Sequence, residues 1–179
     1  SLRLSSGNKL LAPQDDAAGL AVATRLDAQM ARLDAASRNV SSAGSFAQTQ
    51  DAHLRGMDGI VSRMGELAVL AQDGTMPDDI RALYDTEFQQ LKEMVNDVRT
   101  AQLNDVNLFD GQAREVTVSP EGDSVTMGDV DLFTDEFNVL TANTTRLTSM
   151  EGARAALDAT TAAGASVSIE RADIGSTLS

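Results

Sequence analysis

The chain has 179 residues, enough for one domain with a sizeable core, and it carries 27 acidic against 14 basic side chains for a net charge of −13. This balance excludes a chain built to bind nucleic acid or an anionic membrane surface, because both partners require clustered Lys and Arg. Cysteine is absent, His53 is the one histidine and aromatic residues make up 3%, so we expect a soluble protein that is not an enzyme and holds no metal or cofactor.

The first predicted element is a long helix over about residues 17–72, either continuous or interrupted near residues 41–45. Asp15 and Asp16 suit its start, where carboxylates cap free amides, and Asp73-Gly74 suits its end. Apolar residues recur at steps of three and four, which places them on one face and favours coiled-coil-like packing. This expected stripe comprises Val22, Leu26, Leu33, Ala36, Val40, Ala43, Phe46, His53, Met57, Ile60, Met64, Leu67 and Ala71, widened by Leu54, Val61 and Ala68.

Pro77-Asp78-Asp79 predicts the first turn of a second helix, because proline is tolerated at that position. We expect this helix to end near Arg99. Its predicted apolar face comprises Ile80, Leu83, Tyr84, Phe88, Leu91, Met94, Val95 and Val98.

The pattern changes after residue 103. Two short β-type runs, residues 115–118 and 124–127, flank Pro120-Glu121-Gly122-Asp123, and turn residues between alternating strands predict a hairpin. From about Thr141 the helical pattern returns. Small residues in this last helix, such as Ala155-Ala156 and residues 162–165, would let a neighbouring helix approach closely.

These elements predict one mainly α domain, an elongated bundle of long helices with a small β-hairpin region. We expect residues 1–16 to precede the helices as an N-terminal spacer segment, and residues 17–103 to form the long helix and the second helix. Residues 104–139 form the β-hairpin region, and residues 140–179 form the returning C-terminal helix. No apolar run approaches the ~18 residues that span a bilayer.

No constellation of side chains predicts a catalytic or metal site. His53 lies on the apolar stripe, where a lone histidine is expected to pack in the core because a metal needs partners that this chain lacks. Asp129, Asp131, Asp135 and Glu136 alternate loosely, as in calcium loops, but they lack the twelve-residue spacing and the glycine of an EF-hand. We therefore predict no metal ligand among them.

Several blocks in order along the chain resemble bacterial flagellin. The N-terminal blocks are RLSSG at residues 3–7, DDAAGLAVA at 15–23, ASRN at 36–39, AQT at 47–49 and ELAV at 66–69. NDVNLFDG follows at residues 104–111, and IERADIG at 169–175 is a weaker likeness to the family's returning helix. The resemblance covers residues 3–111 and, more loosely, residues 140–175.

The resemblance implies a structural subunit of the bacterial flagellar filament that acts in motility by self-assembly with other flagellin subunits. It implies that this chain is a core-domain fragment, a monomer without the family's terminal coiled-coil segments or outer domains. It also implies export without a cleaved signal peptide to the extracellular flagellum, helped by an export chaperone for the full-length chain. The alternative is a relative of flagellin, the hook–filament junction (hook-associated) protein.

The resemblance further implies recognition by an innate immune receptor, Toll-like receptor 5. The family's receptor motif resembles residues 62–69, SRMGELAV. By that alignment the receptor-contacting arginine and leucine fall on Arg63 and Leu67, and a glutamate on the next helix falls on Glu87. Ser62 and Gly65 depart from the family's polar and basic residues.

Overall fold

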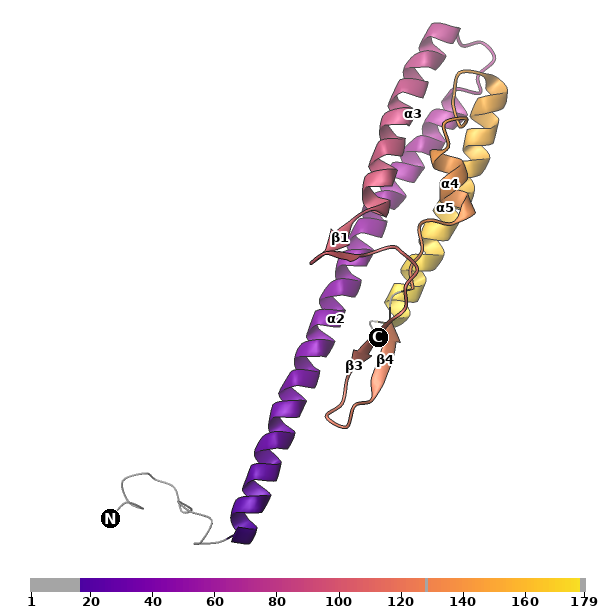
Figure 1. Cartoon of the computed structure of the whole chain (residues 1–179). Coiled ribbons are helices and arrows are strands. Elements are labelled where there is room, and N and C mark those ends of the chain that lie inside the picture. The colour runs from indigo at the N-terminus through magenta and orange to yellow at the C-terminus, as the bar shows by residue number, and fades with distance from the viewer. Residues whose placement is uncertain (1–16, 128, 178–179) are drawn as a thin grey trace. The chain divides into compact units, whose positions relative to one another are not determined.

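The computed structural model describes residues 17–127 and 129–177, and they form a mainly α fold with a small β region (Figure 1). The described chain divides into a smaller unit, residues 17–42 with 115–125, and a larger unit that holds the remaining described residues. Each unit is described by itself, and the prediction of one domain stays a prediction. The expected spacer of residues 1–16, with Asp15 and Asp16, lies outside the described residues.

The first helix, α2 (Ala17–Leu70), is continuous over 54 residues, so the expected helix is confirmed and the interruption near residue 41 is absent. In the larger unit its apolar stripe is buried as predicted, through Leu54, Met57, Val61, Met64, Leu67 and Ala68. His53 is half-buried, and its ring lies edge-on to Phe109 with 6.1 Å between centroids. This half of the stripe forms the core of the larger unit.

The other half of the stripe, in the smaller unit, is exposed, and there the predicted burial is wrong. Ala36 is buried, but Val22, Leu26, Leu33 and Val40 are each about half exposed. The physical reason is that the described residues of this unit include no second helix that could cover the stripe.

The second helix, α3 (Asp78–Arg99), has the predicted bounds, but the predicted face is wrong in part. Phe88 and Val95 are buried as expected, whereas Ile80, Leu83 and Met94 are exposed. The residues that α3 buries follow steps of four and three: Arg81, Asp85, Phe88, Lys92, Val95 and Arg99. Four of the six are charged, and each of the four bonds to a main-chain group.

Two of these side chains, Arg81 and Lys92, satisfy the carbonyls of turns. Arg81 donates from Nε to Ala71 O at 2.9 Å and from Nη2 to Asp73 O at 3.1 Å, which fixes the turn between α2 and α3. Lys92 Nζ donates to Ala142 O at 2.6 Å and to Thr145 O at 3.1 Å. Burial lowers the pKa of Lys92, because removal from water penalises the charged ammonium.

The other two, Asp85 and Arg99, hold the segment that leads to the last helix. Asp85 Oδ1 accepts from Leu147 N at 2.8 Å. Arg99 donates from Nε to Leu132 O at 2.7 Å and from Nη2 to Asn138 Oδ1 at 2.6 Å. Buried charges are tolerated only where such bonds replace the lost water, so these bonds explain why charged residues occupy the core side of α3.

The first hairpin pairs β1 (Gln102–Leu103) with β2 (Val106–Asn107) in antiparallel register, Gln102 opposite Asn107. Its two turn residues have left-handed backbone angles, φ 51° at Asn104 and 62° at Asp105. Asn and Asp tolerate this region better than other non-glycine residues, so this two-residue turn suits them.

The predicted hairpin is confirmed as β3 (Arg114–Thr117) paired with β4 (Ser124–Met127). Ahead of it, the chain passes close to the segment that follows β4. Gly111 adopts φ 67° and donates from N to Val130 O at 3.1 Å, and a Cβ at this position would lie 3.1 Å from the Asp131 Cβ. A side chain there would be strained and crowded.

The prediction that the C-terminal helix begins near residue 140 is wrong. A short helix, α4 (Asp135–Thr141), is followed by a turn, and α5 (Met150–Thr177) begins ten residues later than expected. Ser149 explains the start of α5, because its Oγ accepts from Gly152 N at 3.0 Å. Gly152 is required there, since a Cβ would lie 2.6 Å from Arg146 O.

Small residues bring α5 against α2 in the larger unit, as predicted. Ala153, Ala156 and Ala163 are buried, and a Cβ built on Gly164 would lie 3.7 Å from Val61. Arg171 Nε also donates to Asp51 Oδ1 at 3.0 Å, which joins the two helices by an ion pair. None of the described helices combines the length and apolar character needed to cross a membrane.

We predict that Arg99→Met destabilises the fold, because the buried carbonyl of Leu132 would lose its donor at a cost of about 1–3 kcal/mol, with a similar loss at Asn138. Urea unfolding followed by circular dichroism measures the change. The control is Arg154→Met, an exposed position on α5 that should change stability by less than about 0.5 kcal/mol. Equal stability of the two variants would contradict the role given to Arg99.

Candidate interaction surface

Arg63 of α2 and Glu87 of α3 form a two-bond ion pair on the surface of the larger unit. Arg63 Nε donates to Glu87 Oε1 at 2.8 Å, and Nη2 donates to Oε2 at 3.2 Å. Arg63 Nη1 also donates to Glu66 Oε2 at 2.9 Å, one turn along α2. The structure thus brings together two of the three residues that the sequence singled out.

The pair is exposed, with 45% of the Arg63 side chain and 42% of the Glu87 side chain accessible. The hydrogen bond from Arg63 lowers the pKa of Glu87, and the bonds to Glu87 and Glu66 raise the pKa of Arg63, so both groups are charged over the physiological range. Water screens such a pair, so it adds little to the stability of the fold. Its main effect is to hold the Arg63 guanidinium and the Glu87 carboxylate in fixed positions on the surface.

Leu67, the third predicted residue, is 0% exposed. It belongs to the buried stripe of α2, next to Met64 and Ala68. The three residues therefore do not form one exposed patch, and a partner at this surface would meet Arg63 and Glu87 while Leu67 packs beneath them.

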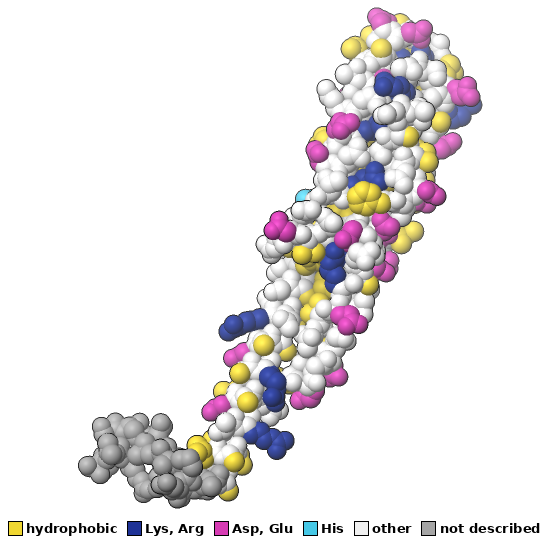
Figure 2. Space-filling view, viewed as in Figure 1, with side chains coloured by type: hydrophobic (Ala, Val, Ile, Leu, Met, Phe, Trp, Pro, Cys, Tyr) yellow, Lys and Arg dark blue, Asp and Glu magenta, His cyan; other side chains and the backbone are white. Residues whose placement is uncertain are grey.

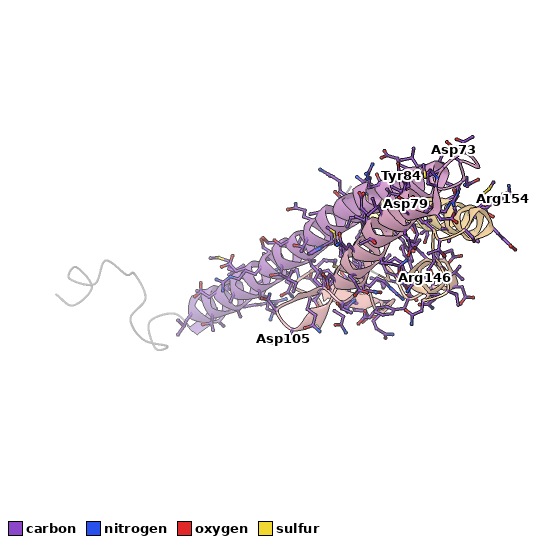
Figure 3. The ribbon with its side chains drawn as sticks, turned by 90° about the horizontal axis from the view of Figure 1, so that it is seen from above. Asp73, Asp79, Tyr84, Asp105, Arg146 and Arg154 are labelled. Atoms are coloured by element: carbon purple, nitrogen blue, oxygen red, sulfur yellow. The ribbon has the colours of Figure 1, made fainter. Side chains whose placement is uncertain are left out.

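Exposed apolar side chains accompany the ion pair on α3. Leu83 lies one turn before Glu87 and is 64% exposed, while Ile80 and Met94 are also exposed. Figure 3 shows Tyr84 and Asp79 on the same helix and Asp73 at the turn that follows α2. We call Arg63, Glu87, Ile80, Leu83 and Met94 the α2–α3 surface.

Sequence reasoning missed the exposure of Ile80, Leu83 and Met94 because it assigned them to the core. A signal was available in the sequence: Arg81, Asp85, Lys92 and Arg99 alternate with Phe88 and Val95, and the six together keep the steps of four and three that are typical of a buried helical face. A repeat of long charged side chains on one face can mark a buried polar seam as well as a solvated one.

A second group of side chains gathers acidic residues near the end of α5. Burial raises the pKa of Glu170 to about 7, with further contributions from Asp173, Asp129 and Asp131. Each neighbouring carboxylate disfavours a further negative charge, so Glu170 holds its proton far above its ordinary range. Elsewhere on the visible face, acidic side chains are scattered rather than gathered (Figure 2).

The acidic residues expected to resemble a calcium loop do not stay together. Asp135 and Glu136 lie in the first turn of α4, where they suit the positive end of the helix dipole. Within residues 17–127 and 129–177, no three acidic or histidine side chains form a group that could hold a metal ion by themselves.

Comparison with known proteins gives one consistent family. A family model described as the bacterial flagellin N-terminal helical region matches residues 1–114. Flagellin of Listeria monocytogenes is 38% identical over 136 residues, covering 73% of this chain and 47% of that protein. The flagellar filament 41 kDa core protein of Borreliella burgdorferi is 35% identical over 117 residues, covering 65% of this chain and 35% of that protein. The chain thus spans half or less of the length of these relatives.

Solved structures show the same architecture. The crystal structure of Bacillus cereus flagellin matches with a TM-score of 0.68 at 27% identity, covering 79% of this chain and 82% of that one. A putative flagellar hook-associated protein from Vibrio parahaemolyticus matches with a TM-score of 0.74 at 16% identity, covering 93% and 89%. At that identity the second likeness shows the fold alone.

We predict that Glu170→Gln flattens the pH dependence of stability. The pKa of Glu170 is raised to about 7 from 4.5, so its proton stabilises the fold fully below about pH 4.5, and this contribution is lost as the pH rises through 7. The variant should therefore gain stability relative to the parent chain as the pH rises over this interval. Urea unfolding at several pH values, without divalent cations, measures it.

The control for this prediction is Glu121→Gln, an exposed position in the hairpin turn. It should leave the slope of stability against pH unchanged. Parallel curves for Glu170→Gln and the parent chain would show that Glu170 titrates in its ordinary range.

Proposed function

The chain belongs to the bacterial flagellin family, and from this we propose that it is a structural subunit of the bacterial flagellar filament, acting in motility by self-assembly with other flagellin subunits. The relatives named above are flagellins and a flagellar filament core protein, which places this chain with structural proteins and not with enzymes. The proposal assigns its mechanism to surface contacts between subunits rather than to a reaction.

The observation that carries the proposal is the exposed apolar stripe on residues 22–40 of α2. Five large side chains lie exposed between residues 22 and 40 of this helix: Val22 59%, Leu26 53%, Met30 61%, Leu33 48% and Val40 48%. Figure 2 shows hydrophobic side chains at the surface of this part of α2. Complete burial of a fully exposed side chain of this size yields about 1.5–3 kcal/mol, and covering these half-exposed side chains yields roughly half of that each, so a surface of this kind favours packing against another chain.

The α2–α3 surface gives a second region that suits contact between subunits. Leu83 and Met94 supply apolar area, and the Arg63–Glu87 pair supplies fixed charges of both signs beside it. Apolar area provides most of the affinity in such contacts, whereas charges set orientation and exclude wrong partners.

The proposed location is the bacterial flagellum outside the cell. The family resemblance supports export without a cleaved signal peptide and a chaperone that accompanies the full-length chain before export. The absence of cysteine agrees with passage to the exterior, because no thiol can form a wrong disulfide there.

The hook–filament junction protein remains the alternative, and the hook-associated protein from Vibrio parahaemolyticus shares the fold. Flagellin is favoured because Ala17 and Ala18 follow Asp15-Asp16, where junction proteins more often place a proline. The two functions differ in assembly, since a filament subunit polymerises by itself and a junction protein attaches to the ends of another structure.

We predict that Leu26→Glu with Leu33→Glu blocks filament growth of the full-length protein, because it places charges where neighbouring subunits are proposed to bury apolar side chains. Sedimentation of polymer after addition of seeds measures growth. The matched control is Ala28→Glu with Ala35→Glu, which adds the same charge to exposed positions on the opposite face of the helix. Equal growth of both double variants would contradict the proposal.

We also propose that Toll-like receptor 5 binds this chain through Arg63 and Glu87, with Leu67 holding the helices in register beneath them. The family motif at residues 62–69 supports the assignment, as does the exposure of the ion pair. Arginine in such a fixed two-bond geometry is a common centre of protein interfaces.

We predict that Arg63→Ala weakens binding of the receptor ectodomain at least about tenfold, the usual effect of losing a central interface arginine. Surface plasmon resonance measures the dissociation constant. Arg55→Ala serves as the control, since Arg55 is also exposed on α2 and paired with Asp51. Unchanged receptor binding of Arg63→Ala would remove this surface from the account.

A further inference from the structure

Gln50 of α2 carries a buried polar atom without a partner. The side chain is 1% exposed, and its Nε2 donates to Leu108 O at 2.6 Å. Its Oε1 is buried and has no hydrogen-bond partner. Leu108 O can only accept a hydrogen bond, so the amide cannot be turned round to place Oε1 next to it. Gln50 Oε1 therefore requires a donor or a cation from another source.

A small cavity lies beside this amide in the larger unit. Its volume is about 20 Å³, and Gln50 lines it together with Asp129 and Asp173, with Met127, Val130 and Ile174 forming apolar wall. Such a volume holds one water molecule or one ion. Gln50, Asp129 and Asp173 come from α2, from the segment after β4 and from α5, and Thr177 of α5 also lines the cavity, so the fold joins positions that are far apart in the sequence.

None of the described residues that line this cavity carries a positive charge. Asp129 and Asp173 contribute carboxylates, and Asp131 adds negative potential nearby. The adjacent cation, Arg171, is already paired with Asp51. A water could donate to the amide oxygen, but only a cation would in addition be attracted by the two carboxylates at the cavity.

We propose that this cavity binds one calcium ion through the carboxylates of Asp129 and Asp173 and through Gln50 Oε1. The proposal departs from the prediction of no metal ligand at Asp129, which rested on sequence spacing alone. Calcium accepts carboxylate and amide oxygens in irregular geometry, whereas magnesium requires a near-ideal octahedron. Only two carboxylates line the cavity, which is why no group of three acidic side chains marks it among the described residues. Both aspartates are exposed at its mouth, so water can complete the coordination shell.

Isothermal titration calorimetry of the full chain with calcium chloride tests the proposal. We expect one saturable site with a dissociation constant of about 10⁻⁴–10⁻³ M, the range of extracellular sites with few carboxylates. Magnesium chloride should bind at least about tenfold more weakly. Asp129→Asn and Asp173→Asn keep the shape of each side chain and remove its charge, so each should weaken calcium binding at least about tenfold.

The matched control is Asp158→Asn, an exposed carboxylate on the same helix as Asp173 but outside the cavity. It should retain the calcium affinity of the parent chain, and circular dichroism should show that all three variants are folded. An absence of saturable calcium binding would overturn the proposal, as would equal affinity in the parent chain and both cavity variants. In either case Gln50 Oε1 would be satisfied by water alone.

Discussion

The structure depends on the charged seam that α3 turns toward the core. Arg81, Asp85, Lys92 and Arg99 are buried at core spacing, and each one bonds to main-chain groups of a turn or loop. A buried charge is costly without such partners, so the turn after α2 and the segment around residues 132–147 are held in the one arrangement that supplies them.

The charged seam also decides what faces outward. Because charged residues occupy the core side of α3, its apolar residues Ile80, Leu83 and Met94 are left at the surface beside the Arg63–Glu87 pair. On α2 apolar residues are exposed for another reason: no described helix of the same unit packs against the stripe over residues 22–40. A chain that exposes apolar helical faces in this way is suited to assembly with copies of itself.

Much of the fold could be predicted from the sequence, because it follows from local periodicity. Steps of three and four predicted α2 and α3, and turn residues between alternating runs predicted the pairing of β3 with β4. The break between α4 and α5 was missed, since it depends on the hydroxyl of Ser149 and on the close approach of Arg146 O to Gly152. The periodicity of apolar residues does not predict contacts between single atoms such as these.

The candidate sites were predicted less completely, for a related reason. The resemblance singled out Arg63, Glu87 and Leu67, and the structure pairs the first two on the surface. Leu67 is buried, as its position on the apolar stripe predicted, so the periodicity of the helix described this residue better than the motif did. The cavity at Gln50 and Asp173 could not be predicted, since its residues meet only in the folded chain.

Cryo-electron microscopy of polymer grown from the full-length protein tests the central claim, that outward apolar faces of α2 and α3 drive assembly. The account predicts long uniform filaments in which Leu26, Leu33 and Leu83 contact neighbouring subunits, while Lys92 and Arg99 keep their bonds to the loops. Filaments in which these leucines face solvent would contradict it. Short rings, or monomers that attach only to the ends of another filament, would assign the chain to the hook–filament junction instead.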